Sequence, residues 1–274
     1  MKTLSSIALA SLAVVTAQSV SAAADCPISR AQLRTAINAA ENAVTGGYGL
    51  NMWLVMVDRT GAICHVLNSS NINGKDTGNA QWLGSRVIAA QKAYTANAFS
   101  LDGYAISTAN LFTPTQQPNS LFELPESNPV DPSVAYAGPA QRWGEANDPL
   151  VNERMGGVNV FGGGLPLYEP VEDGRKIGAI GVSGDTSCRD HAYAFAIREA
   201  LASEDIAGPQ PAGIGITTFN LTVNGGGATP LFGATTGDEM IIDLDNIPSD
   251  PYWANWEHAP CPNTATGIDA VVEN

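Results

Sequence analysis

Residues 159–190 read NVFGGGLPLYEPVEDGRKIGAIGVSGDTSCRD, and this stretch carries the clearest structural signals of the chain. Two apolar runs flank a turn at residues 172–174, and an Asp-Gly pair between apolar runs is typical of a β-hairpin because glycine tolerates the positive φ of such turns. The second run, residues 176–183, is apolar on both faces and contains Gly178 and Gly181. It therefore predicts a central strand, buried on both sides, that another group approaches closely.

A helix is expected to follow this strand. Ser187 and Asp190 form a Ser-x-x-Asp pattern just before the apolar segment 192–201, and this pattern supplies acceptors for the free N–H groups of a first helical turn. We expect Asp185 and Asp190 to cap this helix and to face the positive end of its dipole.

The amino-terminal half predicts a helix and then a second hairpin. Residues 29–44 place apolar side chains at helical spacing after a serine cap, and residues 50–67 contain two apolar runs around a turn. Alternation along the second run predicts two faces, with Ile63, His65 and Leu67 on one and Ala62, Cys64 and Val66 on the other.

Residues 80–100 predict a long helix with a lysine in a mostly apolar stripe. The stripe consists of Ser85, Ile88, Lys92, Thr95 and Phe99. The plainest expectation is that the stem of Lys92 lies at the edge of the core while its ammonium group reaches solvent.

Two segments lack such patterns. Residues 101–157 are rich in Pro, Asn and Gly with scattered aromatic residues, and an insertion of this length is a lid, an ordered wrap over a pocket or a neighbouring subunit, or a surface excursion. Residues 207–274 predict a carboxy-terminal extension of short strands and loops, attached to the core through Cys261. The main domain is then expected at residues 23–206.

The ends and the composition indicate an exported protein. Residues 1–22 begin with Lys2, continue with an apolar centre and end in small residues, which is the pattern of a cleaved secretory signal. We therefore expect a secreted or periplasmic protein. No later stretch has the roughly 20 apolar residues that a membrane span needs, and a net charge of −14 argues against a nucleic-acid partner. The four cysteines predict two disulfides with three possible pairings and no metal site.

Three segments resemble a known family. The sequences KAYTANAF (residues 92–99), GGLPLY (163–168) and KIGAIGVSGD (176–185), followed by a helix near Asp190, are similar to the GlcG/HbpS haem-degrading domain family. The resemblance spans residues 29–203 apart from the insertion. It implies an α+β, profilin-like fold, in which helices pack on an antiparallel sheet, and assembly into homo-oligomers. It also implies haem as a cofactor, since some members bind haem.

Haem requires an apolar slot, an axial donor and cations for its propionates. The candidate haem-binding residues are the donors His65, His191, His258, Tyr94 and Thr95, the cations Arg86 and Lys92, and the apolar Phe99. The leading hypothesis is an exported protein that binds haem or a similar flat ligand, with haem degradation left open.

Two alternatives belong to other functional classes. Lys92, His65 and Asp190 are candidate catalytic residues for a cofactor-independent enzyme, of the acid/base isomerase or lyase type, that acts on a small organic molecule. The other alternative is a non-catalytic, oligomeric assembly protein that uses the insertion and the extension for contacts between subunits.

Overall fold

The centre of the molecule is a four-stranded antiparallel sheet built from two hairpins. The computed structural model describes residues 24–44, 46–70, 82–171, 174–208, 238, 240–241, 256–259, 261 and 272–273. Strands β1 (Trp53–Asp58) and β2 (Ile63–Asn68) form one hairpin, and β3 (Gly164–Tyr168) and β4 (Lys176–Ser183) form the other. The strand order is β2-β1-β4-β3. Both predicted hairpins are confirmed, and so are the interior positions of β1 and β4.

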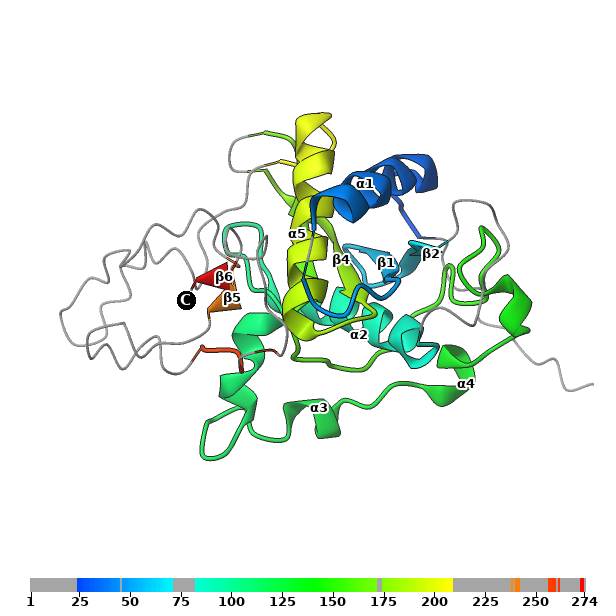
Figure 1. Cartoon of the computed structure of the whole chain (residues 1–274). Helices are drawn as coiled ribbons and strands as arrows, with labels where there is room; N and C mark the ends of the chain where they lie inside the picture. The colour runs from blue at the N-terminus through cyan, green and yellow to red at the C-terminus, as the bar shows by residue number, and fades with distance from the viewer. Residues whose placement is uncertain are drawn as a thin grey trace, which may run out of the picture.

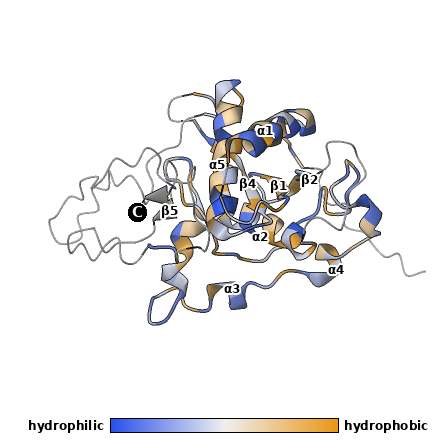
Figure 2. Ribbon diagram, in the orientation of Figure 1, coloured by the Kyte–Doolittle hydropathy of each residue, from blue (hydrophilic) through white to orange (hydrophobic). Residues whose placement is uncertain are grey.

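Helices cover both faces of this sheet (Figure 1). The helices α1 (Arg30–Ala43) and α5 (Ser187–Ser203) lie on one face, where they share a core with Leu54 and Met56 of β1. The helix α2 (Gly84–Phe99) lies on the other face against Val55 and Val57. This arrangement confirms the predicted α+β fold. Figure 2 shows hydrophobic residues along β1 and both kinds of residue along α1, as a helix between core and solvent requires.

The helix boundaries follow from their caps. Ser29 caps α1 through a reciprocal capping box with Gln32, so the predicted amino-terminal helix is confirmed. The cap of α5 is Thr186, whose side chain accepts a hydrogen bond from the backbone N–H of Arg189. The prediction that Ser187 begins this helix as its cap is therefore wrong by one residue.

A β-bulge changes the predicted faces of β2. Met56 of β1 pairs with His65, but the next residue, Val57, pairs with Ile63, so one residue of β2 is left over. As a result Ile63 lies in the core under α2 while Cys64 lies in the core under α1 and α5. The simple alternation expected at these two positions is wrong because the bulge interrupts it.

The insertion is an ordered wrap over the outer side of α2. Its short helices include α3 (Leu124–Ser127) and α4 (Pro132–Ala135), and there are 3-10 turns at Ala109–Leu111, Thr113–Thr115 and Ala140–Arg142. Ala135, Leu150 and Met155 are buried in the core that α2 shares with the sheet. The wrap also covers the edge of the sheet, because Ile63 exchanges backbone hydrogen bonds with residues 152 and 153.

Two disulfides connect the chain, as the cysteine count predicted. Cys26 is bonded to Cys64, and Cys188 is bonded to Cys261, which attaches the carboxy-terminal extension to α5 as expected. Of that extension, the structure describes a short parallel pair, β5 (Met240–Ile241) and β6 (Val272–Glu273), and a few further residues. The predicted signal segment and the expected strand at 214–223 lie outside the described residues. Among the helices of the described part, none has the length and apolar character to cross a membrane.

Gly181 sets how closely α2 approaches the sheet. A Cβ atom at this position would lie 2.0 Å from the carbonyl oxygen of Ala89 and 2.4 Å from the backbone nitrogen of Ala93. Both atoms belong to the backbone of α2, so they cannot move away as a flexible side chain would. The glycines of β4 predicted that another group lies close to this strand, and at Gly181 that group is the backbone of α2.

We expect Gly181→Ala to lower the free energy of unfolding by about 2–3 kcal/mol, because the added methyl group must push α2 off the sheet. Urea denaturation measures this change. The matched control is Gly84→Ala at the start of α2, where no atom lies within 4 Å of the added Cβ and the change should stay within about 0.5 kcal/mol. Equal losses in the two variants would contradict this account of the helix–sheet contact.

Candidate functional site

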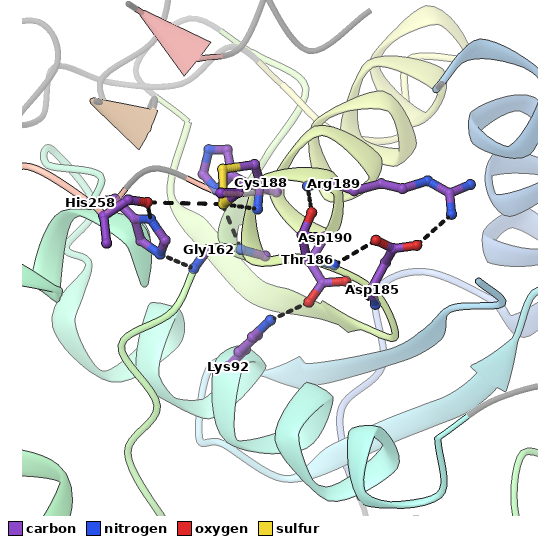
Figure 3. Close-up of a disulfide and its surroundings, with 12 residues drawn as sticks. Lys92, Gly162, Asp185, Thr186, Cys188, Arg189, Asp190 and His258 are labelled. Atoms are coloured by element: carbon purple, nitrogen blue, oxygen red, sulfur yellow. Dashed lines mark hydrogen bonds and ion pairs between the residues drawn. A yellow bond between two sulfur atoms is a disulfide. The ribbon is translucent and has the colours of Figure 1, made fainter. Parts of the chain in front are cut away.

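A buried ion pair joins the two helical layers where β4 ends and α5 begins. The Nζ atom of Lys92 on α2 lies 2.8 Å from Oδ2 of Asp190 on α5, and it also donates to the carbonyl oxygen of Val182 at 3.1 Å. The two side chains are 2% and 3% exposed. Since α2 and α5 lie on opposite faces of the sheet, Lys92 reaches past the start of β3 to make this contact (Figure 3).

The triple glycine at residues 162–164 leaves the space for this crossing. Gly163 has a φ of +119°, and a Cβ atom there would lie 2.4 Å from the carbonyl oxygen of Val182, 3.0 Å from Cβ of Asp190 and 3.2 Å from Nζ of Lys92. A side chain at this position would therefore occupy the path of the ion pair.

Burial favours the neutral form of both partners. It raises the pKa of Asp190 to about 6, although the ammonium of Lys92 acts in the opposite direction, and it lowers the pKa of Lys92. The expectation that the ammonium of Lys92 reaches solvent is wrong, because the gap at Gly163 gives it a buried partner. Asp190 accepts a hydrogen bond from the backbone N–H of Asp185 at 2.9 Å with its other oxygen, so it stabilises the turn before α5.

Two neutral histidines lie beside the same glycines. His191 is fully buried; its Nδ1 accepts from the backbone N–H of Gly163 at 3.4 Å, and its Nε2 has no hydrogen-bond partner among the residues that the structure describes. Burial holds the pKa of His191 well below its ordinary value, with further lowering by Arg198. In the same way, burial lowers the pKa of His258 to about 4. Each imidazole is therefore a neutral base with a lone pair at neutral pH.

The orientation of His258 follows from its hydrogen bonds. Its Nδ1 lies 2.7 Å from the carbonyl oxygen of Ala259, so Nδ1 carries the proton and Nε2 carries the lone pair. The backbone N–H of Gly162 donates to this Nε2 over a long distance of 3.3 Å. Figure 3 shows His258 next to Gly162 and close to Cys188.

A pocket of about 290 Å³ opens at this corner of the molecule. Aromatic side chains and the first turn of α5 form its walls, and His258 and Cys261 also line it. The aromatic residues are Tyr48, Trp82, Phe112 and Phe161. Phe112 lies 4.9 Å from the ring of His258, measured between centroids. Asp185 is the acidic residue of the wall, and its carboxylate is already engaged by Arg189 and by the backbone N–H groups of residues 48, 50 and 186.

The structure does not bring the predicted acid/base set together. Lys92 and Asp190 are in contact, whereas His65 lies on the opposite face of the sheet from α2, where its Nε2 is 3.0 Å from the carbonyl oxygen of Ile28. Neither Lys92 nor Asp190 lines the described pockets.

Arg86 and Thr95 on α2 hold other segments of the chain in place, Arg86 the insertion and Thr95 the residues just after it. The guanidinium of Arg86 is fully buried, where it binds the carboxylate of Asp148 and the carbonyl oxygen of Ala135 and lies 4.5 Å from the ring centroid of Trp143. Thr95 donates to the carbonyl oxygen of Gln91 and accepts from the backbone N–H of Asn159. These contacts explain both polar residues without a ligand.

Tyr94 and Phe99 also have structural surroundings. The ring of Tyr94 lies against the turn at Gly61, where a Cβ atom would be 3.1 Å from it. Phe99 packs against a small cluster formed by Leu111 of the insertion and by Val158 and Val160 just after it. Neither residue lines the aromatic pocket.

Sequence reasoning named His258 but not the aromatic residues around it. Phe112 lies in the insertion, Phe161 just before the triple glycine, and Trp82 before α2. The available signal was the scattered aromatic residues of the insertion, Phe112 among them, but nothing local indicates that Phe112 lies near Phe161, Trp82 and Tyr48 in the folded chain.

A second pocket, of about 470 Å³, is less suited to a flat apolar ligand. Charged residues such as Asp58, Arg59 and Lys176 line it. Its cations are already engaged, since Arg59 pairs with Asp102, Arg175 pairs with Glu169, and Nζ of Lys176 donates to the carbonyl oxygen of Ser100.

Comparison with known proteins gives one family. The model of the family described as "Haem degrading protein HbpS-like" matches residues 28–199. No curated protein matches the chain.

Three solved structures are similar at low identity. The Klebsiella pneumoniae protein ORFY, of family DUF336, is 18% identical, with 69% of this chain and 98% of that chain covered and a TM-score of 0.42. A PduOC–haem complex is 20% identical, with 63% and 94% covered and a TM-score of 0.40. HbpS is 20% identical, with 68% and 99% covered and a TM-score of 0.39. Because all three TM-scores are below 0.5, these structures contribute no functional assignment.

We expect the carboxyl group of Asp190 to titrate near pH 6 in the folded protein. Because this pKa is raised above the ordinary 3.8, the stability that Asp190 contributes is fully present below pH 3.8 and is lost as the pH rises through about 6. In Lys92→Met the pKa of Asp190 should rise further, because the ammonium that lowers it is gone. Carbon-detected NMR of the carboxyl groups measures both values.

Asp185 is the internal control for this titration. It lies in the same turn, but hydrogen bonds from Leu50, Tyr48 and Thr186 and from Arg189 outweigh its burial and lower its pKa below 3.8. An ordinary pKa for Asp190, or no upward shift in Lys92→Met, would contradict the account of the ion pair.

Proposed function

Because the chain belongs to the HbpS-like haem degrading protein family, we propose that it binds haem in the aromatic pocket at the start of α5, with His258 as the axial donor. The observation that carries this proposal is a neutral imidazole in the wall of a pocket whose other side chains are largely aromatic. Bound haem would supply a redox-active iron to this site.

The walls of the pocket suit a flat macrocycle. Phe112 and Phe161 lie 6.1 Å apart between ring centroids, and together with Tyr48 and Trp82 they offer apolar faces. The volume of about 290 Å³ is at the small end of the range for ligand sites. The pocket would therefore enclose only part of a haem, which these four aromatic residues would hold.

The lone pair of His258 fits the requirement for an axial donor. The hydrogen bond from Nδ1 to Ala259 fixes the tautomer and leaves Nε2 as the donor atom. Binding of iron at Nε2 would displace one long hydrogen bond from Gly162. His191 is a less suitable donor because it does not line the pocket and is fully buried.

The propionates of haem require partners other than the two predicted cations, Arg86 and Lys92. Arg86 is engaged by Asp148 and Lys92 by Asp190, and the described residues that line the pocket include no lysine or arginine. The first turn of α5 contributes Thr186 and Ser187 to the wall, and the positive end of a helix favours a carboxylate. We infer that one propionate faces this turn and the other faces solvent.

The alternative of an acid/base enzyme receives less support from the structure than haem binding does. Its proposed residues are divided between the two faces of the sheet, and the paired Lys92 and Asp190 have no described pocket beside them. Export and assembly into oligomers stay predictions from the sequence and from the family resemblance.

Haemin titration of the purified protein tests the proposal. We expect a saturable Soret shift at one haemin per chain, and we expect His258→Ala to weaken apparent affinity at least about tenfold, or about 1.4 kcal/mol. Phe112→Ala should weaken binding without changing the spectrum, because it removes an apolar wall and no donor atom. Decay of the Soret band with a reductant in air would extend the function to haem degradation.

His65→Ala is the matched control, because His65 lies on the opposite face of the sheet and should not affect the spectrum. If His191→Ala removes the shift and His258→Ala does not, haem binding stands but the axial donor is His191. A shift that neither saturates nor responds to any of these substitutions would refute haem binding in this pocket.

A further inference from the structure

Three metal-ligating side chains meet beside the amino-terminal end of α5. The Sγ atoms of Cys188 and Cys261 and a ring nitrogen of His258 all lie within 4.8 Å of one another. Cys188 belongs to α5, whereas His258 and Cys261 come from the extension and are separated by two residues. Such short spacing between ligands, on two segments of the chain, is common in zinc sites.

The start of α5 favours thiolates at this position. Cys188 is the second residue of a helix of 17 residues, and its backbone N–H donates to Sγ of Cys261 at 3.1 Å. The positive end of a helix lowers the pKa of a nearby thiol, and the thiolate is the form that binds a metal ion. Both sulfur atoms share this environment.

His258 is already oriented as a metal-binding histidine. Its Nδ1 donates to the backbone carbonyl of Ala259, which leaves the lone pair on Nε2, where it accepts only the long hydrogen bond of 3.3 Å from Gly162. Histidines bound to metals commonly donate their second ring N–H to a carbonyl or a carboxylate in this way.

The three ligand atoms lie within 4.8 Å of one another, with the two sulfur atoms bonded to each other. Zn–S and Zn–N bonds of about 2.3 and 2.1 Å place ligand atoms about 3.5–3.8 Å apart, so rotations of side chains suffice once the sulfur atoms are no longer bonded. His191 on α5 is a candidate for the fourth ligand, although it lies outside the group of three whose ligand atoms are within 4.8 Å of one another. It follows Cys188 by three residues, which places the two on the same side of the helix, and among the described residues its buried Nε2 has no hydrogen-bond partner. Because Nδ1 accepts from Gly163, Nε2 carries the ring proton, which must move to Nδ1 before Nε2 can bind the ion.

We propose that reduction of the Cys188–Cys261 disulfide creates a binding site for a thiophilic divalent ion such as Zn²⁺, with the two thiolates and Nε2 of His258 as ligands and His191 as the fourth. With a water-soluble phosphine as reductant, the S–S bond breaks, each sulfur receives a hydrogen and the phosphorus takes an oxygen atom from water. Zn²⁺ then displaces two protons from the thiols. Exchange of the two thiolates with a small-molecule disulfide reforms the Cys188–Cys261 bond, reduces that disulfide to two thiolates and releases the ion. This site goes beyond haem binding and is tested on haem-free protein.

The experiment measures zinc binding to phosphine-reduced, haem-free protein by competition with a chromophoric chelator. Cobalt(II) in place of zinc reports thiolate ligation through its charge-transfer absorption. We expect one ion per reduced chain, at least tenfold weaker binding to the oxidised protein, and at least about tenfold weaker binding to reduced His258→Ala. Loss of His191 as fourth ligand in His191→Ala should change the cobalt spectrum.

Paired cysteine variants provide the control. Cys188→Ser with Cys261→Ser should abolish the site, whereas Cys26→Ser with Cys64→Ser removes the other disulfide and should retain it. If reduction unfolds the protein, added zinc should restore its far-UV circular dichroism, since metal binding then supplies folding free energy. Undiminished binding in the Cys188→Ser/Cys261→Ser variant, or neither binding nor restored structure in the reduced protein, would overturn the proposal. Either result leaves haem binding by the oxidised protein untouched.

Discussion

The contact between Lys92 and Asp190 is the constraint on which the arrangement of the layers depends. Taking two charges out of water costs several kcal/mol each, so a buried ion pair is rarely a net source of stability. Removal of one partner is different, because it leaves an uncompensated buried charge and costs about 3–5 kcal/mol. The pair therefore disfavours any arrangement of the layers in which one of the two charges is buried without its partner. Only when α2 and α5 have docked on their own faces, with Gly163 between them, does each charge find its partner.

The elements of this fold were predictable because their signals are local. Helical spacing, the serine cap at Ser29 and the glycines of β4 each concern a few neighbouring residues. The ion pair is not local, since 98 positions separate Lys92 from Asp190. A lysine in an apolar stripe commonly extends to solvent, and nothing within α2 indicates that a gap in a distant strand offers it a carboxylate. The bulge at Ile63 was missed for a similar reason, because alternation alone does not reveal an extra residue.

The candidate site was harder to predict than the fold because separate segments build it. Of the proposed haem-binding residues, those on α2 turned out to have structural partners: Arg86 anchors the insertion through Asp148, and Thr95 accepts from the backbone N–H of Asn159, just after the insertion. The aromatic pocket instead combines the insertion, the triple-glycine segment and the extension. The composition indicates that these segments contain aromatic residues, but only the folded structure shows which of them line the same pocket. The buried polar residues of α2 thus bind segments of the chain that do not line the pocket.

The segment that contains His258 links the two proposals through a single atom. Nε2 of His258 is the axial donor proposed for haem and also a ligand of the proposed zinc site, and one lone pair binds one metal at a time. Haem and zinc should therefore exclude each other at this corner. The disulfide decides between them, because while Cys188 and Cys261 are bonded their sulfur atoms are not thiolates and only the imidazole remains as a strong ligand. On these two proposals, oxidising conditions would favour haem and reducing conditions with zinc present would favour zinc, so the disulfide that attaches the extension to α5 would govern which metal His258 binds.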